Sequence, residues 1–485
     1  MRRGGSTAIG LTCVVLAVAR CGGVGSSAAG SPARVKATPQ PDAGSGSSGN
    51  PDGGQAGDVG VIPKDDCASG AAPPETVRLS VKLVGAGSGR IESQPAGIAC
   101  PGHCCAAFDK DSKVTLFAAS DPGSALAYWA GGCRGRPASC TLSAWQDFDI
   151  IAAFEPPPPV AYSLRVIPKA NKALALNSTG NATGVGYGGP QNANGDGFLF
   201  DAATGLSSYL PFSYGEASYA QGINDRNALV VNVITGLNEL KSRTIRWENG
   251  VATALATIGP PDSNTWGYAI NASNEVVGWF VFKSLGRGLT YDRAFLHDGQ
   301  RMIDLGSLDG TCSEAYAINS AGTAVGISCA PGLSRHAVVF HRGGPIEDLT
   351  PDSWGSADGI SDTGYVVGRA GYDGFIREPD GSMRNVGSLS GGSGSWLHGV
   401  NDAGIAVGVA FVPSYFPQGF THAGEPDDAP RAAVWMNGRL WDLAYMTGRS
   451  DLWLLDAQAI NGSGQILAEP FSCDGEACSL LLTPR

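Results

Sequence analysis

Polar and apolar positions repeat one short phrase along the last two thirds of the chain. In each copy a small residue and then an apolar residue precede an Asn or Ser, and a Gly or Asn follows three places later. This is the composition of a type I turn, since Gly and Asn accept a left-handed backbone at least cost. Each phrase therefore predicts a β-hairpin tip. We call its Asn or Ser the anchor, and the seven anchors are Asn177, Asn224, Asn271, Asn319, Ser361, Asn401 and Asn461.

The residue two places before every anchor is small. A side chain kept small at one fixed place of a repeat indicates close packing against a neighbour. We therefore expect a crowded contact at this position. The residues concerned are Ala175, Gly222, Ala269, Ala317, Gly359, Gly399 and Ala459.

Four short strands are predicted around each anchor. One leads into the turn, an apolar strand returns from it, as in residues 276–278, and two more follow, as in residues 294–296 and 303–305. Consecutive anchors lie 40 to 60 residues apart. Four short strands in a repeat of this length match propeller blades rather than a helical repeat. The fold predicted for residues 161–485 is an all-β, seven-bladed β-propeller.

The two ends of the repeat region complement each other. The seventh module stops at Arg485 after its third strand, and an unassigned strand-like segment, residues 162–167, precedes the first anchor. If that segment completes the last blade, the ring closes and no strand edge is left to template aggregation. An open β-solenoid is the structural alternative.

The first third of the chain divides into four segments by composition. Residues 1–20 form a signal peptide, because Arg2 and Arg3 precede an apolar stretch too short to span a bilayer. Residues 21–75 are a disordered tether rich in Gly, Ser, Pro and Asp. Residues 76–154 alternate as the strands of a small β domain, and residues 155–160 are a stiff Pro linker.

The end of the signal peptide can be interpreted in two ways. Residues 18–21 resemble the lipobox of bacterial lipoproteins, which implies that Cys21 is lipidated and anchors the protein to an outer or cell-surface membrane. Arg20 stands where that family has Gly, Ala or Ser. The alternative is cleavage after the A-x-A pattern of residues 17–19, which would release a soluble secreted or periplasmic protein.

An exported chain with an even number of cysteines beyond Cys21 favours disulfides. Cys312 and Cys329 stand symmetrically about one anchor turn, and Cys473 and Cys478 bracket a short loop. In the small domain we expect one short-loop pair and a second pair with two possible partners, which leaves one cysteine for Cys67. A thiolate zinc site is the alternative for the small-domain cluster. The first pair is Cys133 with Cys140, and the second is Cys100 with Cys104 or Cys105.

Two regions resemble families of bacterial surface proteins. Residues 304–310 followed by 317–322 look like the HAF-type extracellular repeat, although Val231 and Ala468 replace its usual Gly in the second and seventh modules. Residues 97–100, 129–133 and 151–154 resemble the divergent internalin-type B-repeat. Both resemblances imply an exported, surface-displayed protein, and neither implies an activity.

Charge and motifs exclude several function classes. The net charge of −11, without a dense Lys/Arg run, argues against nucleic acid as a partner. The sequence has no H-E-x-x-H motif and no recognisable nucleophile elbow, so we expect no enzyme. His336 and His341 are five apart on a predicted strand and so point to opposite faces, which argues against shared metal ligation.

Two further polar patterns have ordinary structural interpretations. Residues 192–197 resemble the start of a calcium loop, but its twelfth position is Ala203 instead of Glu, so we expect no metal. No cofactor is expected either. Aspartates recur on the fourth strands and are expected to bind backbone groups, namely Asp304, Asp348 and Asp442.

Four tryptophans fall five to eight residues before an anchor, in the predicted connections between blades. They could form a platform for sugars or a protein partner, or wedge between blades. The expected function is a non-enzymatic, exported or cell-surface binding or structural module, with glycan or protein as ligand. The alternative is a polysaccharide hydrolase or lyase, which carboxylates or histidines at the propeller axis would favour. The tryptophans are Trp266, Trp354, Trp396 and Trp453.

Overall fold

The structure is a computed structural model that describes residues 75–187, 195–212, 217–235, 241–258, 263–286, 289–331, 334–413, 428–471 and 478–485. Within these ranges the secondary structure is β-strand except for one short helix, α1 (Leu443–Met446). The strands form nine four-stranded sheets. The signal peptide, Cys21, Cys67 and Cys473 lie outside the described residues.

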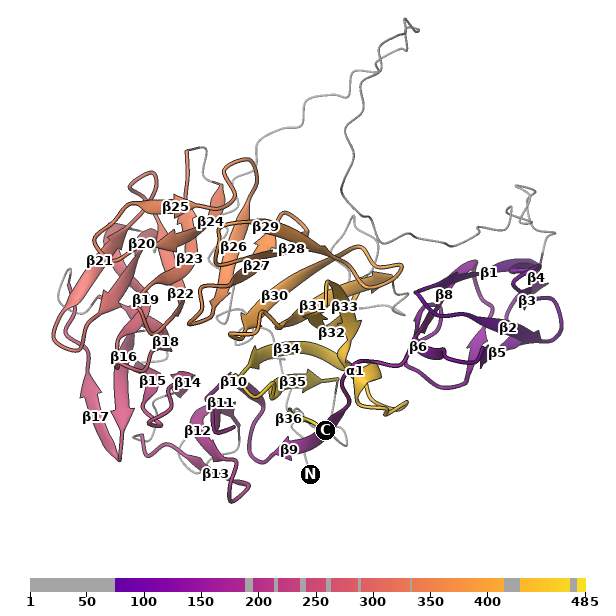
Figure 1. Ribbon diagram of the computed structural model, residues 1–485, viewed down its shortest axis with the longest axis horizontal. Coiled ribbons are helices and arrows are strands. Elements are labelled where there is room, and N and C mark those ends of the chain that lie inside the picture. Colours follow the sequence, from indigo (N-terminus) through magenta and orange to yellow (C-terminus); the bar gives the residue numbers. More distant parts are fainter. Residues whose placement is uncertain are drawn as a thin grey trace, which may run out of the picture. The chain divides into compact units, whose positions relative to one another are not determined.

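Eight strands build the small N-terminal domain (Figure 1). They pair as two sheets, in the orders β4-β1-β8-β6 and β3-β2-β5-β7. Alternate residues of β1 point inward, and the shared core contains the fully buried Leu79, Trp129 and Phe154. The strands are β1 (Thr76–Val84), β2 (Gly89–Gln94), β3 (Ala99–Cys100), β4 (Cys105–Asp109), β5 (Lys113–Ser120), β6 (Ala125–Gly131), β7 (Ser139–Ser143) and β8 (Phe148–Glu155).

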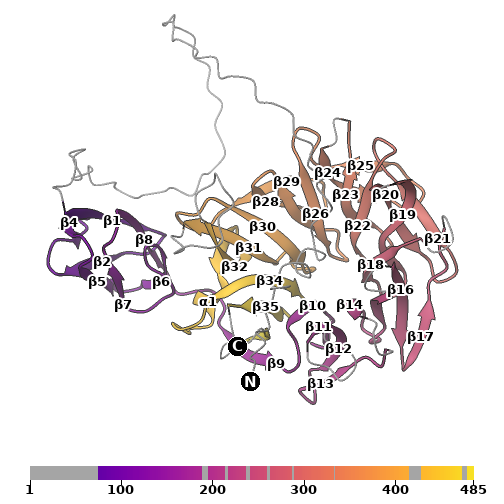
Figure 2. The same cartoon turned by 180° about the vertical axis from the view of Figure 1, so that it is seen from behind.

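The other seven sheets follow one another along the chain as propeller-like blades (Figures 1 and 2). Each is an antiparallel sheet of four strands in sequence order, apart from the last. The first six are β10 (Lys172–Leu176), β11 (Ala182–Gly186), β12 (Asp196–Asp201), β13 (Leu206–Tyr209); β14 (Ala217–Ile223), β15 (Leu229–Thr235), β16 (Lys241–Glu248), β17 (Val251–Ala254); β18 (Thr265–Ile270), β19 (Val276–Gly286), β20 (Leu289–His297), β21 (Met302–Gly306); β22 (Ser313–Ile318), β23 (Ala324–Cys329), β24 (Arg335–Phe340), β25 (Ile346–Asp348); β26 (Gly355–Ile360), β27 (Val366–Ala370), β28 (Asp373–Arg377), β29 (Met383–Gly387); and β30 (Gly394–Val400), β31 (Ala406–Pro413), β32 (Asp428–Met436), β33 (Arg439–Asp442).

The last sheet joins the two ends of the repeat region. It consists of β34 (Leu454–Ile460), β35 (Ile466–Pro470), β36 (Ser479–Pro484) and β9 (Tyr162–Ile167). β9 pairs antiparallel with β36 from Tyr162 opposite Pro484 to Ile167 opposite Ser479. The prediction that residues 162–167 complete the last module is confirmed. The first strands of consecutive sheets contact one another, and β34 also contacts β10.

All seven anchors form the predicted turns. The backbone N–H three places after each anchor donates to the anchor carbonyl, as Gly322 does to Asn319. That third residue has a positive φ in every turn, for example 59° at Asn227 and 96° at Gly364. Turn composition therefore identified the hairpin tips correctly.

Anchor side chains also link the sheets. The Nδ2 group of Asn177 donates to the carbonyl of Asn224 at 3.2 Å, and the same bond recurs between further consecutive anchors. Asn461 donates to Asn177 at 3.0 Å and so connects the last sheet to the first. Ser361 lacks an amide, and there Thr363 of the same turn donates from its backbone N–H to Asp402 instead. All seven anchors are buried.

The crowding predicted before each anchor is present between sheets. A Cβ added at Gly359 would lie 2.7 Å from the carbonyl oxygen of His398 and 3.2 Å from Cα of Gly399, the equivalent small residue of the next module. At Gly222 the equivalent contact is 3.1 Å, to Cα of Ala269. The position is kept small because the first strands of neighbouring sheets meet there.

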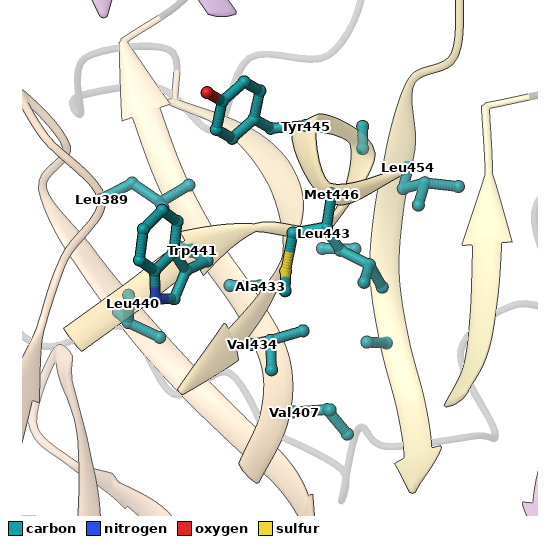
Figure 3. Packing of buried hydrophobic residues seen from close by; sticks show 14 of the residues in the cluster. Leu389, Val407, Ala433, Val434, Leu440, Trp441, Leu443, Tyr445, Met446 and Leu454 are labelled. Atoms are coloured by element: carbon teal, nitrogen blue, oxygen red, sulfur yellow. The ribbon is translucent and has the colours of Figure 1, made fainter. Parts of the chain in front are cut away.

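Apolar clusters lie between consecutive sheets and in the seam with the small domain. One cluster joins Val277 to Val338 of the next sheet. The largest extends from Tyr128 of the small domain into the β30–β33 sheet, and Figure 3 shows Val434 and Trp441 within it. The Tyr128 hydroxyl donates to the Ser390 carbonyl at 2.5 Å.

Three disulfides lie within the described residues, and they show which cysteine pairs with Cys100. Cys100 bonds Cys104, so Cys104 rather than Cys105 is its partner. The other two join the predicted pairs Cys133–Cys140 and Cys312–Cys329, and these two predictions are confirmed. Cys105 and Cys478 are also disulfide-bonded, although the expected partner of Cys478, Cys473, lies outside the described residues. In this cluster the structure has disulfides and not the thiolates that a zinc site would need.

Candidate functional site

The two ends of each propeller-like sheet hold different turns and connections between strands. The anchor turn joins the first and second strands at one end, so antiparallel pairing puts the second-to-third connection and the link to the next sheet at the other. We call this other end the connection face. The connections at this face lie outside the repeated phrase.

Exposed aromatic side chains gather on the connection face. Within the described residues 162–485, large exposed hydrophobic side chains occur there or on the fourth strands of the sheets, and not at the anchor turns. Tyr372 is 69% exposed and Phe471 is 64% exposed. The connection-face residues are Tyr187, Phe282, Trp354, Tyr372 and Phe471, and those on fourth strands are Val166, Leu206, Val251 and Met383.

One group of these aromatics combines flat rings with a cation. The rings of Trp354 and Tyr372 meet edge to face at 5.6 Å, and Trp354 is 40% exposed. The Arg369 guanidinium lies 4.8 Å from the Trp354 ring centre and 3.8 Å from that of Trp396. Cation–π contact of this kind orients both indoles and leaves Trp354 and Tyr372 open to solvent.

A second aromatic pair lies on the last sheet. Trp453 and Phe471 stack with ring centres 5.9 Å apart and an interplanar angle of 25°. The Trp453 indole N–H donates to the Pro430 carbonyl at 3.2 Å, which fixes the ring. Phe471 remains the solvent-facing member of the pair.

The four predicted tryptophans therefore divide into two types. Trp354 and Trp453 lie in connections between sheets, as expected. Trp266 and Trp396 instead lie within the first strands β18 and β30, so their placement in the connections was wrong. Trp266 is 5% exposed and packs 5.7 Å from Tyr219 of the preceding sheet, as the wedge interpretation describes.

Polar side chains meet across the first strands of five consecutive sheets, β18 to β34. Trp396 donates its indole N–H to Asp358 at 2.7 Å, and His398 lies 3.2 Å from Asp456. Farther along, the Tyr268 hydroxyl donates to Glu314 at 3.3 Å. We call this set the first-strand polar row, and it consists of Tyr268, Glu314, Tyr316, Asp358, Trp396, His398 and Asp456.

A β-bulge explains why the sequence did not reveal this row. In every sheet the pairing of first and second strands shifts between the residues four and two places before the anchor. The extra residue breaks the alternation that assigns side chains to faces. In four sheets that residue belongs to the row, namely Tyr268, Tyr316, Asp358 and His398.

Burial raises the pKa of two side chains in the row, Glu314 and Tyr316. Burial raises the pKa of Glu314, and the nearby Asp292 carboxylate adds to the rise while Arg335 opposes it. Burial, assisted by Glu314, also holds the pKa of Tyr316 well above its ordinary range. Burial therefore favours the neutral forms of Glu314 and Tyr316, which can donate hydrogen bonds.

Aspartates on the fourth strands bind the backbone as predicted. Asp304 accepts from the Gly306 N–H, Asp348 from Thr350 and Asp442 from Tyr445, at 2.8 to 3.0 Å. Their carboxylates also reach the third strands, where Asp442 pairs with the buried Arg431.

The histidines on β24 and in the turn after it have separate partners. His336 bonds Asp348 and His341 bonds Glu347. No group of three or more metal-ligating side chains occurs in the described part of the chain. Residues 192–194 of the calcium-like loop lie outside it. None of the described helices is long and apolar enough to cross a membrane.

No family model matches the chain, and no curated protein matches it. Among solved structures, similarity extends to TolB from Acinetobacter baumannii, at 12% identity and a TM-score of 0.34, covering 64% of each chain. Streptogramin B lyase has 10% identity and a TM-score of 0.40, with 67% of this chain and 98% of the lyase covered.

A third solved structure is the β-propeller domain of the Trilobed protease from Pyrococcus furiosus. It has 10% identity and a TM-score of 0.35, with 69% of this chain and 95% of that domain covered. The chain spans 64% of the length of TolB. At this level of identity and similarity, no activity or ligand is transferred from these proteins.

Proposed function

We propose that residues 161–485 form a closed, seven-bladed β-propeller that binds carbohydrate chains on its connection face. Three observations support the closed ring. Seven four-stranded sheets follow in sequence, β9 completes the last one, and an anchor amide connects the last sheet to the first. An open solenoid would need no pairing between β9 and β36.

The gathering of exposed aromatics carries the binding proposal. Tyr and Trp rings offer rigid apolar faces that stack on the C–H faces of sugar rings, while their polar atoms reach the hydroxyl groups. Trp354 and Tyr372 form such a pair beside Arg369. A partly exposed aromatic pair on an open face suits an extended polysaccharide better than a small buried ligand.

A glycan array probed with the purified mature protein tests this function. We expect binding to at least one polysaccharide, and its loss when Trp354→Ala and Tyr372→Ala are combined. Because both side chains are exposed, the folded state should keep its melting temperature. The matched control combines Leu206→Ala with Met383→Ala, which removes exposed apolar side chains from fourth strands and should leave binding unchanged. Equal binding by both double variants would refute the proposed face.

The first-strand polar row supports the second candidate, a polysaccharide hydrolase or lyase. A carboxyl group with a raised pKa, such as Glu314, can donate a proton to a leaving group. The length of the glycans recovered after incubation with the protein distinguishes the two functions. A binding module returns them at their original length, whereas an enzyme shortens them and loses that activity in Glu314→Gln.

The proposed location is the cell surface. The lipobox-like residues 18–21, the HAF-type repeats and the internalin-like small domain support export with a lipid on Cys21. Mass spectrometry of the mature N-terminus distinguishes this anchor from a free, soluble chain.

A further inference from the structure

A serine, a histidine and an aspartate form a continuous hydrogen-bonded relay at the connection face of the β22–β25 sheet. The Ser334 hydroxyl oxygen lies 2.9 Å from Nε2 of His336, and Nδ1 of the same ring lies 2.8 Å from Oδ2 of Asp348. Ser334 immediately precedes β24, in the connection from β23. His336 is only 8% exposed, whereas Ser334 is half-buried.

The partners fix the direction of both hydrogen bonds. An ionised carboxylate only accepts hydrogen bonds, so the proton of a neutral imidazole is on Nδ1 and points at Asp348. Nε2 then has a free lone pair and accepts from the Ser334 hydroxyl. This is the protonation pattern in which a histidine can remove a proton from serine.

Neighbouring backbone groups hold the relay in place. The second carboxylate oxygen of Asp348 accepts from the Thr350 N–H at 3.0 Å, and the Thr350 hydroxyl accepts from the Ala337 N–H at 2.9 Å. The Ser334 carbonyl accepts from the Ala330 N–H at 3.0 Å. Ser334 and Asp348 are therefore held by bonds outside the relay, and His336 pairs with Ser328 of β23 in the strand ladder.

We propose that Ser334 is an acyl-accepting nucleophile, with His336 as its general base and Asp348 as the residue that positions the histidine. The substrates are carboxylic esters with short acyl groups, because Ser334 is only partly open to solvent. This proposal is independent of carbohydrate binding. It assigns an activity where no sequence motif indicated one.

Ester hydrolysis at this relay needs only the three side chains and water. As the Ser334 oxygen bonds to the ester carbonyl carbon, its proton passes to Nε2 of His336. The bond to the alkoxy oxygen then breaks, and the departing alcohol takes that proton. Water attacks the acyl-serine in the second half, gives one proton to Nε2, and releases the carboxylic acid as that proton returns to Ser334.

A fluorophosphonate probe on the purified mature protein tests the assignment. We expect the probe to modify the peptide that contains Ser334, with loss of the signal in Ser334→Ala and a labelling rate reduced about 100-fold in His336→Gln. Hydrolysis of p-nitrophenyl acetate should follow the same order. Absence of labelling in the wild-type protein, or equal labelling after His336→Gln, would overturn the proposal.

Two controls separate chemistry from structure. Ser382 donates to Asp380 at 2.7 Å without a histidine, so it reports ordinary serine reactivity and should stay unlabelled. Asp348→Asn keeps an oxygen for Thr350 but disturbs the histidine, and it should lower kcat for the ester without changing KM. Asp304→Asn alters the neighbouring sheet, where Arg293 takes the place of histidine, and should leave kcat unchanged. A fall in kcat in Asp304→Asn equal to that in Asp348→Asn would contradict the assignment.

Discussion

Individual side chains in this protein often serve two partners at once. An anchor asparagine accepts backbone N–H groups of its own turn through Oδ1 and donates through Nδ2 to the next sheet, as Asn224 does. The first of these roles was predictable, because turn composition is local. The second was not, because it depends on which module lies alongside.

Glu314 should make the stability of the protein depend on pH. Because its pKa is raised in the folded state, the stabilisation from its protonated form is complete below the ordinary value of 4.5 and is lost as pH rises through the raised folded value. Gln is neutral at every pH and can still accept from Tyr268. Thermal unfolding should show Glu314→Gln to be more stable than wild type at pH 8, with the difference shrinking toward pH 4.

The opposite pH trend would contradict this account of Glu314. If Arg335 dominated instead, the variant would be the less stable protein at pH 8. That ion pair is 3.9 Å long and its arginine is 42% exposed, so its contribution should be small.

Among the strands and turns, small residues recur where two backbone segments come into close contact. A glycine recurs in the second strands, and a Cβ at Gly326 would lie 1.9 Å from the carbonyl oxygen of Glu314 on the first strand. The same contact occurs at Gly278 and Gly368, to Trp266 and Ser356. The sequence showed the glycine but not its cause, which is the bulge in the facing strand.

Gly326→Ala therefore tests the bulge. The added methyl group must displace a strand carbonyl, and we expect a loss of about 3 kcal/mol in the free energy of unfolding. Gly462→Ala is the control, because nothing lies within 4 Å of a Cβ built there. Chemical denaturation measures both variants. Similar stabilities for the two would show that the first and second strands do not approach as described.

For the molecule as a whole, the fold was far more predictable than the site. Periodic anchors revealed four-stranded modules, and the unmatched segment before the first anchor revealed the strand that completes the last one. The relay of Ser334, His336 and Asp348 was hidden because its members come from the β23–β24 connection and from two strands, β24 and β25. The exposure of Tyr372 could not be predicted either, because Tyr372 lies on the connection face and outside the repeated phrase.

Hydrogen–deuterium exchange of β9 measures whether the ring is closed between the two ends of the repeat region. We expect backbone amides of residues 162–167 to be protected to the same extent as those of β36. Leu164→Pro should expose both strands together, because it breaks their ladder. β13, the fourth strand of the next module, should keep its protection in that variant. Rapid exchange of β9 in the wild-type protein, with β36 still protected, would contradict the closed ring.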